Sequence, residues 1–482
     1  GFRFRHLLIR DAAYESLPKA TRAELHERFA GWLSAHALVE GDEIVGYHLE
    51  QAHRYREELD GADPALPGLA KRASDRLAAA GRGALDRGDH NAGRALLRRA
   101  SAILPAADPR RSALAPDLAL ALFESGEPEE ARTVVAEART ALDPVTAAIG
   151  TIVDDAINYL TAGGRSADAR LTTLEKAYDV LARAGHDEGL GYYWWWVAGE
   201  KWLRLLAAET ATACERGLHH FDRAGIHSRT DDLLWWIRSA YVFGPTPVPE
   251  GIERVRALLA AAGDSLLSQA GATTTLARLL SMQGDFEQAR ELYTSGRDFY
   301  RSAGMATSAG GVTMHAAWIE EHAGDLAAWE AALRTGYEEL ERIGNRNFLS
   351  TVAAYLAQCL YLQGRFDEVA DMCPLIRELS PPGDLINFVY ADALEGCLHA
   401  HADRHEEARS LVGSAVERVE TTDFVFARAQ IRLWHAETLS RAGETVEEAR
   451  SAALAITLLD DKADLTGAAR ARERVAQLAA GH

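Results

Sequence analysis

Apolar residues along the chain recur at the three- and four-residue spacing of a helix, and short polar segments interrupt them at regular distances. Leu276, Leu279 and Leu280 precede one such segment at Gly284, and Tyr293 follows it. The alternation of apolar and polar residues that indicates strands is nearly absent. The pattern predicts a repeated unit of one helix, a tight turn and a second helix.

The polar segments share a pattern, in which a glycine is followed by charged or polar residues and then by a small residue five positions after the glycine. Gly126 to Arg132, for example, reads Gly-Glu-Pro-Glu-Glu-Ala-Arg. Six clear segments begin at positions 88, 126, 284, 364, 403 and 444, the last two with an acidic residue in place of the glycine. Four weaker copies begin at or near positions 164, 208, 246 and 324, and the intervals between all ten lie between 38 and 44 residues. Glycine adopts the left-handed conformation that ends a helix, and acidic residues favour the first turn of the next one. The period therefore indicates a stack of helical hairpins.

These segments resemble the tetratricopeptide repeat (TPR), which has a Gly-x4-Ala core and a proline twelve residues further on. Pro105 and Pro381 stand at that position after the segments at Gly88 and Gly364. The resemblance implies an all-α, TPR-like α-solenoid over residues 63–482, a right-handed superhelix of about ten helical hairpins. It also implies a concave groove that binds a protein or a peptide.

The first sixty residues carry a second resemblance. The stretch Phe2-Arg3-Phe4-Arg5-His6 alternates like a short strand, residues 7–17 have the spacing of a helix, and a helix over residues 21–36 carries Leu25, Phe29, Trp32 and Leu33 on one side. The string resembles the end of the winged-helix region in STAND-type ATPases, most closely that of actinobacterial adenylate/guanylate cyclase proteins with ATPase and TPR regions. We therefore expect residues 1–18 to end a winged-helix region and residues 19–62 to form a helical hairpin that links to the solenoid.

That resemblance implies a sensor or scaffold module that regulates an upstream output domain, with a nucleotide cyclase as the expected domain. ATP or ADP and Mg²⁺ would then bind in the upstream domains, and His6 would be a remote nucleotide sensor; packing at the junction of strand and helix is the favoured alternative for His6. Two other functions remain open, the inducer-binding region of a LuxR-type STAND transcriptional regulator and a small-molecule receptor. Self-association on ligand binding is compatible with each of these functions.

Composition narrows the possible partners. The chain has 482 residues, 48% of them hydrophobic, and a net charge of −19. An acidic surface repels phosphate backbones, so direct binding to nucleic acid is not expected. Charged residues interrupt every apolar stretch before the length of a membrane span, and the four cysteines show no disulfide or zinc spacing, so we expect a cytoplasmic protein away from membranes.

Motifs of catalysis are missing from the sequence. It contains no Gly-x4-Gly-Lys-Ser/Thr loop to bind phosphates and no recognisable nucleophile or zinc motif, so this chain is not expected to be an enzyme. Residues 460–464 read Asp-Asp-Lys-Ala-Asp, the spacing of a magnesium motif in terpenoid enzymes. The segment follows the last repeat without a facing acidic motif, and a solvated turn is the favoured interpretation.

Tryptophans are the strongest candidate binding residues. Trp194, Trp195 and Trp196 are consecutive in one first helix, and Trp235 and Trp236 follow one repeat later. Consecutive residues of a helix point to different sides, so these side chains cannot all join one core. Because first helices line the concave surface of a TPR-like solenoid, we predict that Trp195, Trp196, Trp202 and Trp236 contact a protein or peptide partner or a small-molecule inducer.

Overall fold

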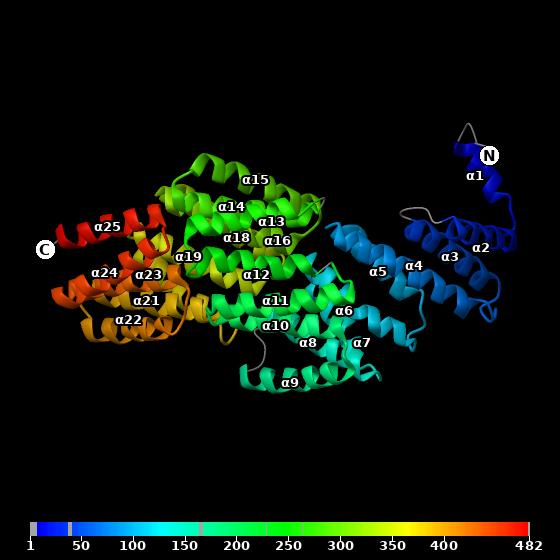
Figure 1. Ribbon diagram of the computed structural model, residues 1–482, viewed down its shortest axis with the longest axis horizontal. Coiled ribbons are helices and arrows are strands. Elements are labelled where there is room, and N and C mark those ends of the chain that lie inside the picture. Colours follow the sequence, from blue (N-terminus) through cyan, green and yellow to red (C-terminus); the bar gives the residue numbers. More distant parts are fainter. Residues whose placement is uncertain (1–6, 37–40, 163–166, 228, 264, 481–482) are drawn as a thin grey trace.

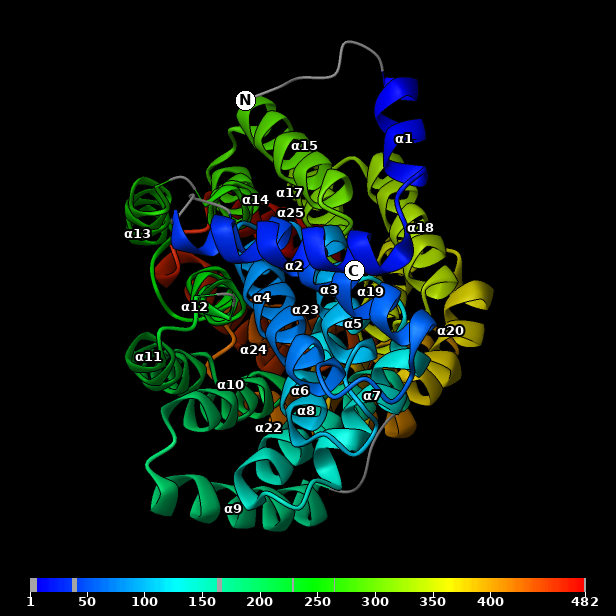
Figure 2. The same cartoon turned by 90° about the vertical axis from the view of Figure 1, so that its right-hand side faces the viewer.

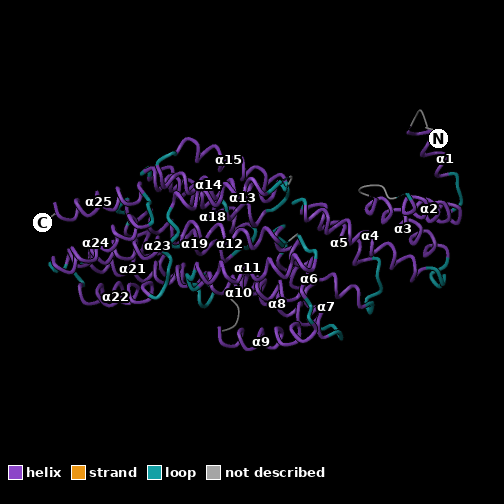
Figure 3. Tube along the Cα trace, in the orientation of Figure 1, coloured by secondary structure: helices purple, strands orange, loops and turns teal. Residues whose placement is uncertain are grey.

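The computed structural model describes residues 7–36, 41–162, 167–227, 229–263 and 265–480. Within these ranges every regular element is a helix, and loops connect the helices (Figure 3). The molecule is elongated, with the N-terminal helices at one end and α25 (Leu465–Ala480) at the other (Figure 1). The all-α architecture predicted from the sequence is confirmed.

Three helices precede the repeats: α1 (Leu7–Glu15), α2 (Lys19–Ala35) and α3 (Gly41–Leu59). The Tyr14 hydroxyl of α1 lies 2.7 Å from Nε2 of His26 on α2. Leu33 is buried, whereas Leu25, Phe29 and Trp32 are about half exposed, at 45%, 44% and 52%. The buried face of α2 consists of Ala23, His26, Ala30 and Leu33, so most of the apolar side predicted for this helix is exposed.

Ten helical hairpins follow these helices and correspond to the ten predicted units. They comprise α4 (Leu66–Asp86) and α5 (His90–Ala102), α6 (Pro109–Glu124) and α7 (Pro128–Arg139), α8 (Pro144–Ala162) and α9 (Ala167–Ala184), α10 (Asp187–Leu203) and α11 (Ala207–Ala224), and α12 (Thr230–Phe243) and α13 (Val248–Ala261). The others are α14 (Leu266–Gln283) and α15 (Phe286–Ser302), α17 (Thr313–Ala323) and α18 (Leu326–Arg342), α19 (Arg346–Leu362) and α20 (Phe366–Leu379), α21 (Leu385–His401) and α22 (His405–Glu420), and α23 (Val425–Arg441) and α24 (Thr445–Asp461). A short helix, α16 (Ala306–Gly311), precedes α17 and forms with it one broken first helix.

The turns adopt the conformation that the repeat pattern predicts. Gly88, Gly126, Gly284 and Gly364 all have positive φ, between 74° and 89°. At Gly284 the next residue, Asp285, accepts a hydrogen bond from the backbone N–H of Gln288 and so caps the following helix. The left-handed glycine and the capping acid thus end one helix and begin the next.

The hairpins wind so tightly that successive superhelical turns touch. Contacts join α6 to α16, α8 to α19, α12 to α23 and α14 to α25. When α16 and α17 are counted as one helix, each contact joins helices ten apart, so that five hairpins complete one turn. Figure 2 looks along the molecule and shows α9 to α13 along one side, α14 and α15 across the top, and α18 and α20 on the other side.

Charged side chains of the second turn cap helices of the first. The Asp423 carboxylate accepts hydrogen bonds from the backbone N–H groups of Ala207 and Ala208, at 2.6 and 2.9 Å, at the start of α11. Lys462 Nζ donates to the carbonyl oxygens of Tyr241, Gly244 and Thr246, at 2.6 to 2.7 Å, at the end of α12 and in the loop after it. A carboxylate at a helix N-terminus and an ammonium at a C-terminus both match the helix dipole.

The same contacts correct the interpretation of residues 460–464 as a solvated turn. Lys462 and Asp464 are only 3% and 2% exposed, respectively. Asp464 lies 3.2 Å from Nε2 of His322 on α17 and accepts from the backbone N–H of Gly467. Lys462 and Asp464 thus form a buried contact between superhelical turns, whereas Asp460 and Asp461 are exposed.

Candidate ligand-binding cavity

The interior of the superhelix holds a cavity of about 290 Å³. Its walls come mainly from the first helices α6, α8, α10 and α12 of one turn and from α16, α17, α19 and α23 of the next, with single side chains from other helices such as α9. The cavity exists because the turns close on each other, and a molecule inside it would contact both. The break between α16 and α17 also lies at its wall, where Gly311 and Val312 line it.

Aromatic rings form the largest part of the wall. The Trp202 ring lies 5.2 Å from that of Trp236 on α12, and 4.6 Å from that of Phe424 at the start of α23. Phe243 stacks on Phe424, with their ring centroids 5.6 Å apart. These rings join first helices of both turns, and such a surface favours an apolar or aromatic ligand.

All four tryptophans predicted from the sequence line this cavity: Trp195, Trp196, Trp202 and Trp236. Trp196 is buried, and the other three are partly buried. Their neighbour Trp194 points elsewhere, because the Arg216 guanidinium of α11 lies 4.5 Å from its ring. The structure therefore brings the predicted residues together, and their contact with a ligand stays a prediction. His6 lies outside the described residues.

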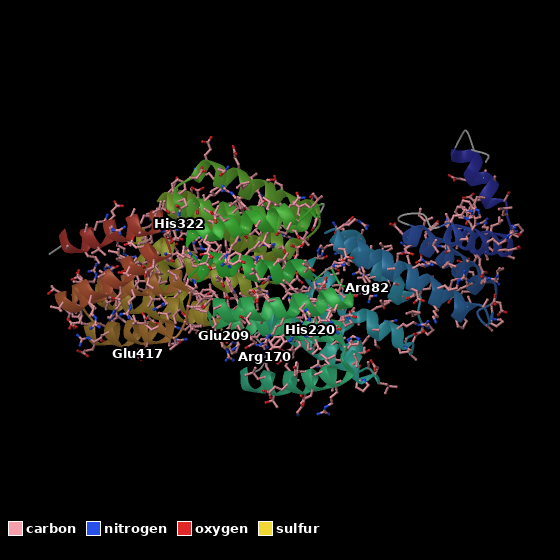
Figure 4. All side chains as sticks on the ribbon, viewed as in Figure 1. Arg82, Arg170, Glu209, His220, His322 and Glu417 are labelled. Carbon is pink, nitrogen blue, oxygen red and sulfur yellow. The ribbon has the colours of Figure 1, made fainter. Side chains whose placement is uncertain are left out.

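A saturated ionic network holds Trp196 in place. Arg170 donates to the Asp155 carboxylate at 2.9 and 2.8 Å and to Glu200 at 2.5 Å. The Trp196 indole N–H donates to the same Asp155 oxygen at 2.8 Å. Figure 4 shows Arg170 on α9, beside the helices that carry these partners. Because every partner is itself bonded, this network fixes the shape of the wall.

Two carboxyl groups, those of the partly buried Glu124 and the buried Asp384, also line the cavity. Glu124 accepts hydrogen bonds from the backbone N–H of Ser308, at 3.0 Å, and from its hydroxyl, so it caps the N-terminus of α16 in the next turn. Burial raises the pKa of Glu124 to about 7. Burial likewise raises the pKa of Asp384, before α21, to about 7. Both groups therefore titrate near neutral pH.

Arg238 of α12 is the least satisfied charge at the wall. It is 2% exposed, and its Nη1 lies 3.7 Å from the Asp231 carboxylate, beyond hydrogen-bond distance. Among the described residues, its Nε and Nη1 have no hydrogen-bond partner. Asp231 accepts instead from the Ser268 hydroxyl at 2.9 Å, and burial raises its pKa.

Comparison with known proteins identifies the fold. No model of a known protein family matches the chain, and no curated protein matches it by sequence. A crystal structure of a Rap protein complexed with competence and sporulation factor superposes with a TM-score of 0.52 at 9% identity, covering 74% of this chain and all of the other. The fold is a TPR-like α-solenoid. At this level of identity the likeness concerns the fold alone.

Two further TPR-like solenoids superpose less well. The apo form of RapI gives a TM-score of 0.39 at 10% identity, covering 72% of this chain and 97% of the other. Yeast Tom70 gives 0.36 at 11% identity and covers 96% of each chain.

The solenoid has a second hollow near its C-terminal end. It measures about 760 Å³ and lies between α17, α19, α23 and α25, where Glu321, Gln358 and Gln430 form a row of buried polar side chains. Gln358 Nε2 donates to Glu321 at 3.1 Å and to Gln430 at 3.3 Å. This hollow is larger but polar. Its side chains bond to one another, and Glu321 Oε2, Gln358 Oε1 and Gln430 Nε2 have no hydrogen-bond partner among the described residues. The aromatic cavity is the better candidate for a ligand site because its rings remain partly accessible.

Other candidate chemistry is limited. Among the described residues, no group of three or more His, Cys, Asp or Glu side chains is placed to hold a metal ion. No described helix is long and apolar enough to cross a bilayer. Many arginines of residues 71–111 pair with carboxylates, as Arg99 does with Glu50 at 2.5 Å and Arg111 with Glu137 at 2.7 Å.

Several residues of the cavity were not predicted from the sequence. Phe348 and Phe424 carry no repeat signal, and they reach the cavity only because the second turn lies against the first. Arg238 follows Trp235 by three residues on α12 and so lies on the same face of the helix. The sequence shows this spacing, but only the structure shows that this face points to the cavity.

Proposed function

We propose that this chain is a ligand-sensing module whose axial cavity holds a small organic molecule or the end of a peptide. The observation that carries the proposal is the aromatic wall of Trp202, Trp236 and Phe424, which closes around a cavity of about 290 Å³ between two superhelical turns. A volume of that size suits a small ligand or a short peptide segment rather than a folded domain. The Rap structure that shares the fold is described as complexed with competence and sporulation factor, which supports ligand binding by such a solenoid.

Occupancy of the cavity gives a route from binding to a signal. Trp202 belongs to the first turn and Phe424 to the second, so a ligand between them contacts both turns. A ligand shifts a conformational equilibrium by its difference in affinity for the two states. A molecule that fits only when the turns are closed would therefore favour the closed superhelix.

The output of this signal belongs to the same proposal. The resemblance of the first sixty residues to STAND-type ATPases supports a role as the sensor of a longer signalling protein, with a nucleotide cyclase domain as output and ATP and Mg²⁺ bound outside this chain. The exposed aromatic side chains of α2, Phe29 and Trp32, add a surface on which a further domain or protein can pack. A LuxR-type regulator would use the same sensor with a different output.

Filling the cavity tests the proposal. Gly199 on α10 lines the cavity, and an added Cβ there would meet only the Trp236 ring, at 3.9 Å. The Cβ of Gly199→Phe therefore fits without a clash and directs a ring into the cavity, and Gly199→Ala is the matched control because it adds only a methyl group. Binding of the neutral fluorescent probe N-phenylnaphthylamine is measured for both variants and the wild type, together with the melting temperature.

We expect the wild type and Gly199→Ala to bind the probe and Gly199→Phe to lose at least about tenfold in affinity, the equivalent of 1.4 kcal/mol. The melting temperature of Gly199→Ala should not fall, because alanine favours a helix over glycine. Equal binding by the wild type and by a folded Gly199→Phe would reject the cavity as the site.

A further inference from the structure

Three buried arginines line the cavity, and they differ in how well they are paired. Arg170 is 3% exposed and donates to two carboxylates within 2.9 Å. Arg229 is 6% exposed and donates to Asp232 at 3.0 Å. Arg238 is 2% exposed, yet its Nη1 lies 3.7 Å from the Asp231 carboxylate with which it pairs. A buried guanidinium without a bonded carboxylate is costly, so Arg238 has unused capacity to bind an anion.

The residues around Arg238 do not supply the acceptor that its guanidinium lacks. Asp231 is the only carboxylate that forms an ion pair with it among the described residues, and Asp231 accepts from the Ser268 hydroxyl. Gly271 of α14 makes room for the guanidinium, because a Cβ added at Gly271 would overlap Nη2 of Arg238. The position is therefore held open for the guanidinium by the backbone of a neighbouring helix.

The helical spacing places Arg238 beside the aromatic wall. Asp231, Trp235 and Arg238 follow each other at four and three residues on α12 and share one face. All three line the cavity. Trp235 also contacts Trp236, with ring centroids 4.5 Å apart, and Trp202, at 5.9 Å. One end of a ligand in this cavity would meet a cation and the rest would meet indole rings.

Resting on the function proposed above, we infer that the ligand carries a carboxylate on an apolar or aromatic body. Arg238 binds the carboxylate, and Trp202, Trp235 and Trp236 hold the body. Guanidinium matches the planar, two-oxygen geometry of a carboxylate. A small organic acid and the C-terminus of a short peptide share this chemistry.

Paired competitors separate charge from shape. N-phenylnaphthylamine is bound first and then displaced at pH 7.5 by phenylbutanoate or by phenylbutanamide, which differ only in the carboxylate. A second pair uses the tripeptide Ala-Leu-Phe with a free or an amidated C-terminus. In the wild type the acid of at least one pair should displace the probe at about tenfold lower concentration than its amide, because bonds between charged groups are the stronger ones. The pair that discriminates shows which source the site accepts.

Two variants assign the preference to Arg238. In Arg238→Gln the acid and the amide should displace the probe equally, with probe binding itself retained. In Asp231→Asn the preference for the acid should increase, because a carboxylate that competes for the same guanidinium loses its charge. In Arg238→Gln the Asp231 carboxylate keeps its hydrogen bonds from the Ser268 hydroxyl, and the melting temperature of the variant checks that it folds.

Each outcome has one meaning. Equal displacement by acid and amide in the wild type, with probe binding still lost in Gly199→Phe, overturns the carboxylate and leaves the cavity as the ligand site. A preference for the acid that persists in Arg238→Gln overturns the role of Arg238. Probe binding that Gly199→Phe leaves unchanged rejects the proposed function, and this inference with it.

Discussion

Replacing Lys462 by methionine removes the contact that joins the second superhelical turn to the end of α12. The ammonium group is buried, with a residue exposure of 3%, and donates to three carbonyl oxygens between 2.6 and 2.7 Å. Methionine keeps the length of the side chain and cannot donate. The carbonyl groups of Tyr241, Gly244 and Thr246 would then lose a charged donor.

The expected cost follows from that geometry. A buried acceptor without a partner costs about 1–3 kcal/mol, and bonds to a charged donor lie at the upper end. The variant no longer has to desolvate an ammonium group. This gain offsets part of the cost of leaving three acceptors without a partner. Burial lowers the pKa of Lys462 to about 7, so the cost of burying the ammonium group is large, and we expect Lys462→Met to lower the free energy of unfolding by about 1–3 kcal/mol.

Urea denaturation followed by circular dichroism measures this loss. Lys201→Met is the matched control, because Lys201 Nζ pairs with Glu209 at 2.5 Å but its side chain is 34% exposed, and pairs near the surface contribute about 0–1 kcal/mol. If Lys462→Met loses no more than Lys201→Met, the contact between superhelical turns does not stabilise the molecule and the reasoning is refuted.

Three further predictions concern packing, the cavity and pH. Ala289 is fully buried between the helices of its hairpin, so Ala289→Phe should lower the free energy of unfolding by about 1–3 kcal/mol, and an unchanged urea midpoint would contradict the repeat register. Trp434 is fully buried and Trp236 only partly so. Trp434→Ala should lower the free energy of unfolding by about 3–5 kcal/mol, whereas Trp236→Ala should lower it less and weaken binding of N-phenylnaphthylamine. The reverse order would place the wrong tryptophan at the cavity. Because burial raises the pKa of Glu124 in the folded state to about 7 from an ordinary 4.5, its contribution to stability is greatest below pH 4.5 and is lost as pH rises to 7. Glu124→Gln should therefore gain stability relative to the wild type between pH 5 and pH 7.5, and parallel urea midpoints for the two proteins over that range would exclude this titration.

The repeat was readable in the sequence because its determinants are local. A glycine with positive φ, a capping aspartate and a small residue act within one hairpin, as at Gly284, Asp285 and Ala289. The position of the tryptophans followed from the same period, since it assigns Trp202 and Trp236 to first helices. These features need no knowledge of how the hairpins wind.

The closure of the superhelix could not be read in the same way. It depends on a small rotation between neighbouring hairpins, which accumulates over five hairpins before the turns meet. Lys462 looked solvated because its three acceptors lie more than two hundred residues earlier in the chain. Phe424 was not predicted to line the cavity for the same reason, because its contact with Trp202 cannot be inferred from the local sequence.

A crystal structure of the chain soaked with a brominated N-phenylnaphthylamine tests the central claim most directly, because the anomalous signal of bromine locates the probe independently of its shape. We expect the bromine peak inside the superhelix, between the rings of Trp202, Trp236 and Phe424. A peak only at the exposed aromatic side chains of α2, or a cavity found filled by its own side chains, would contradict a ligand site at the centre of the solenoid.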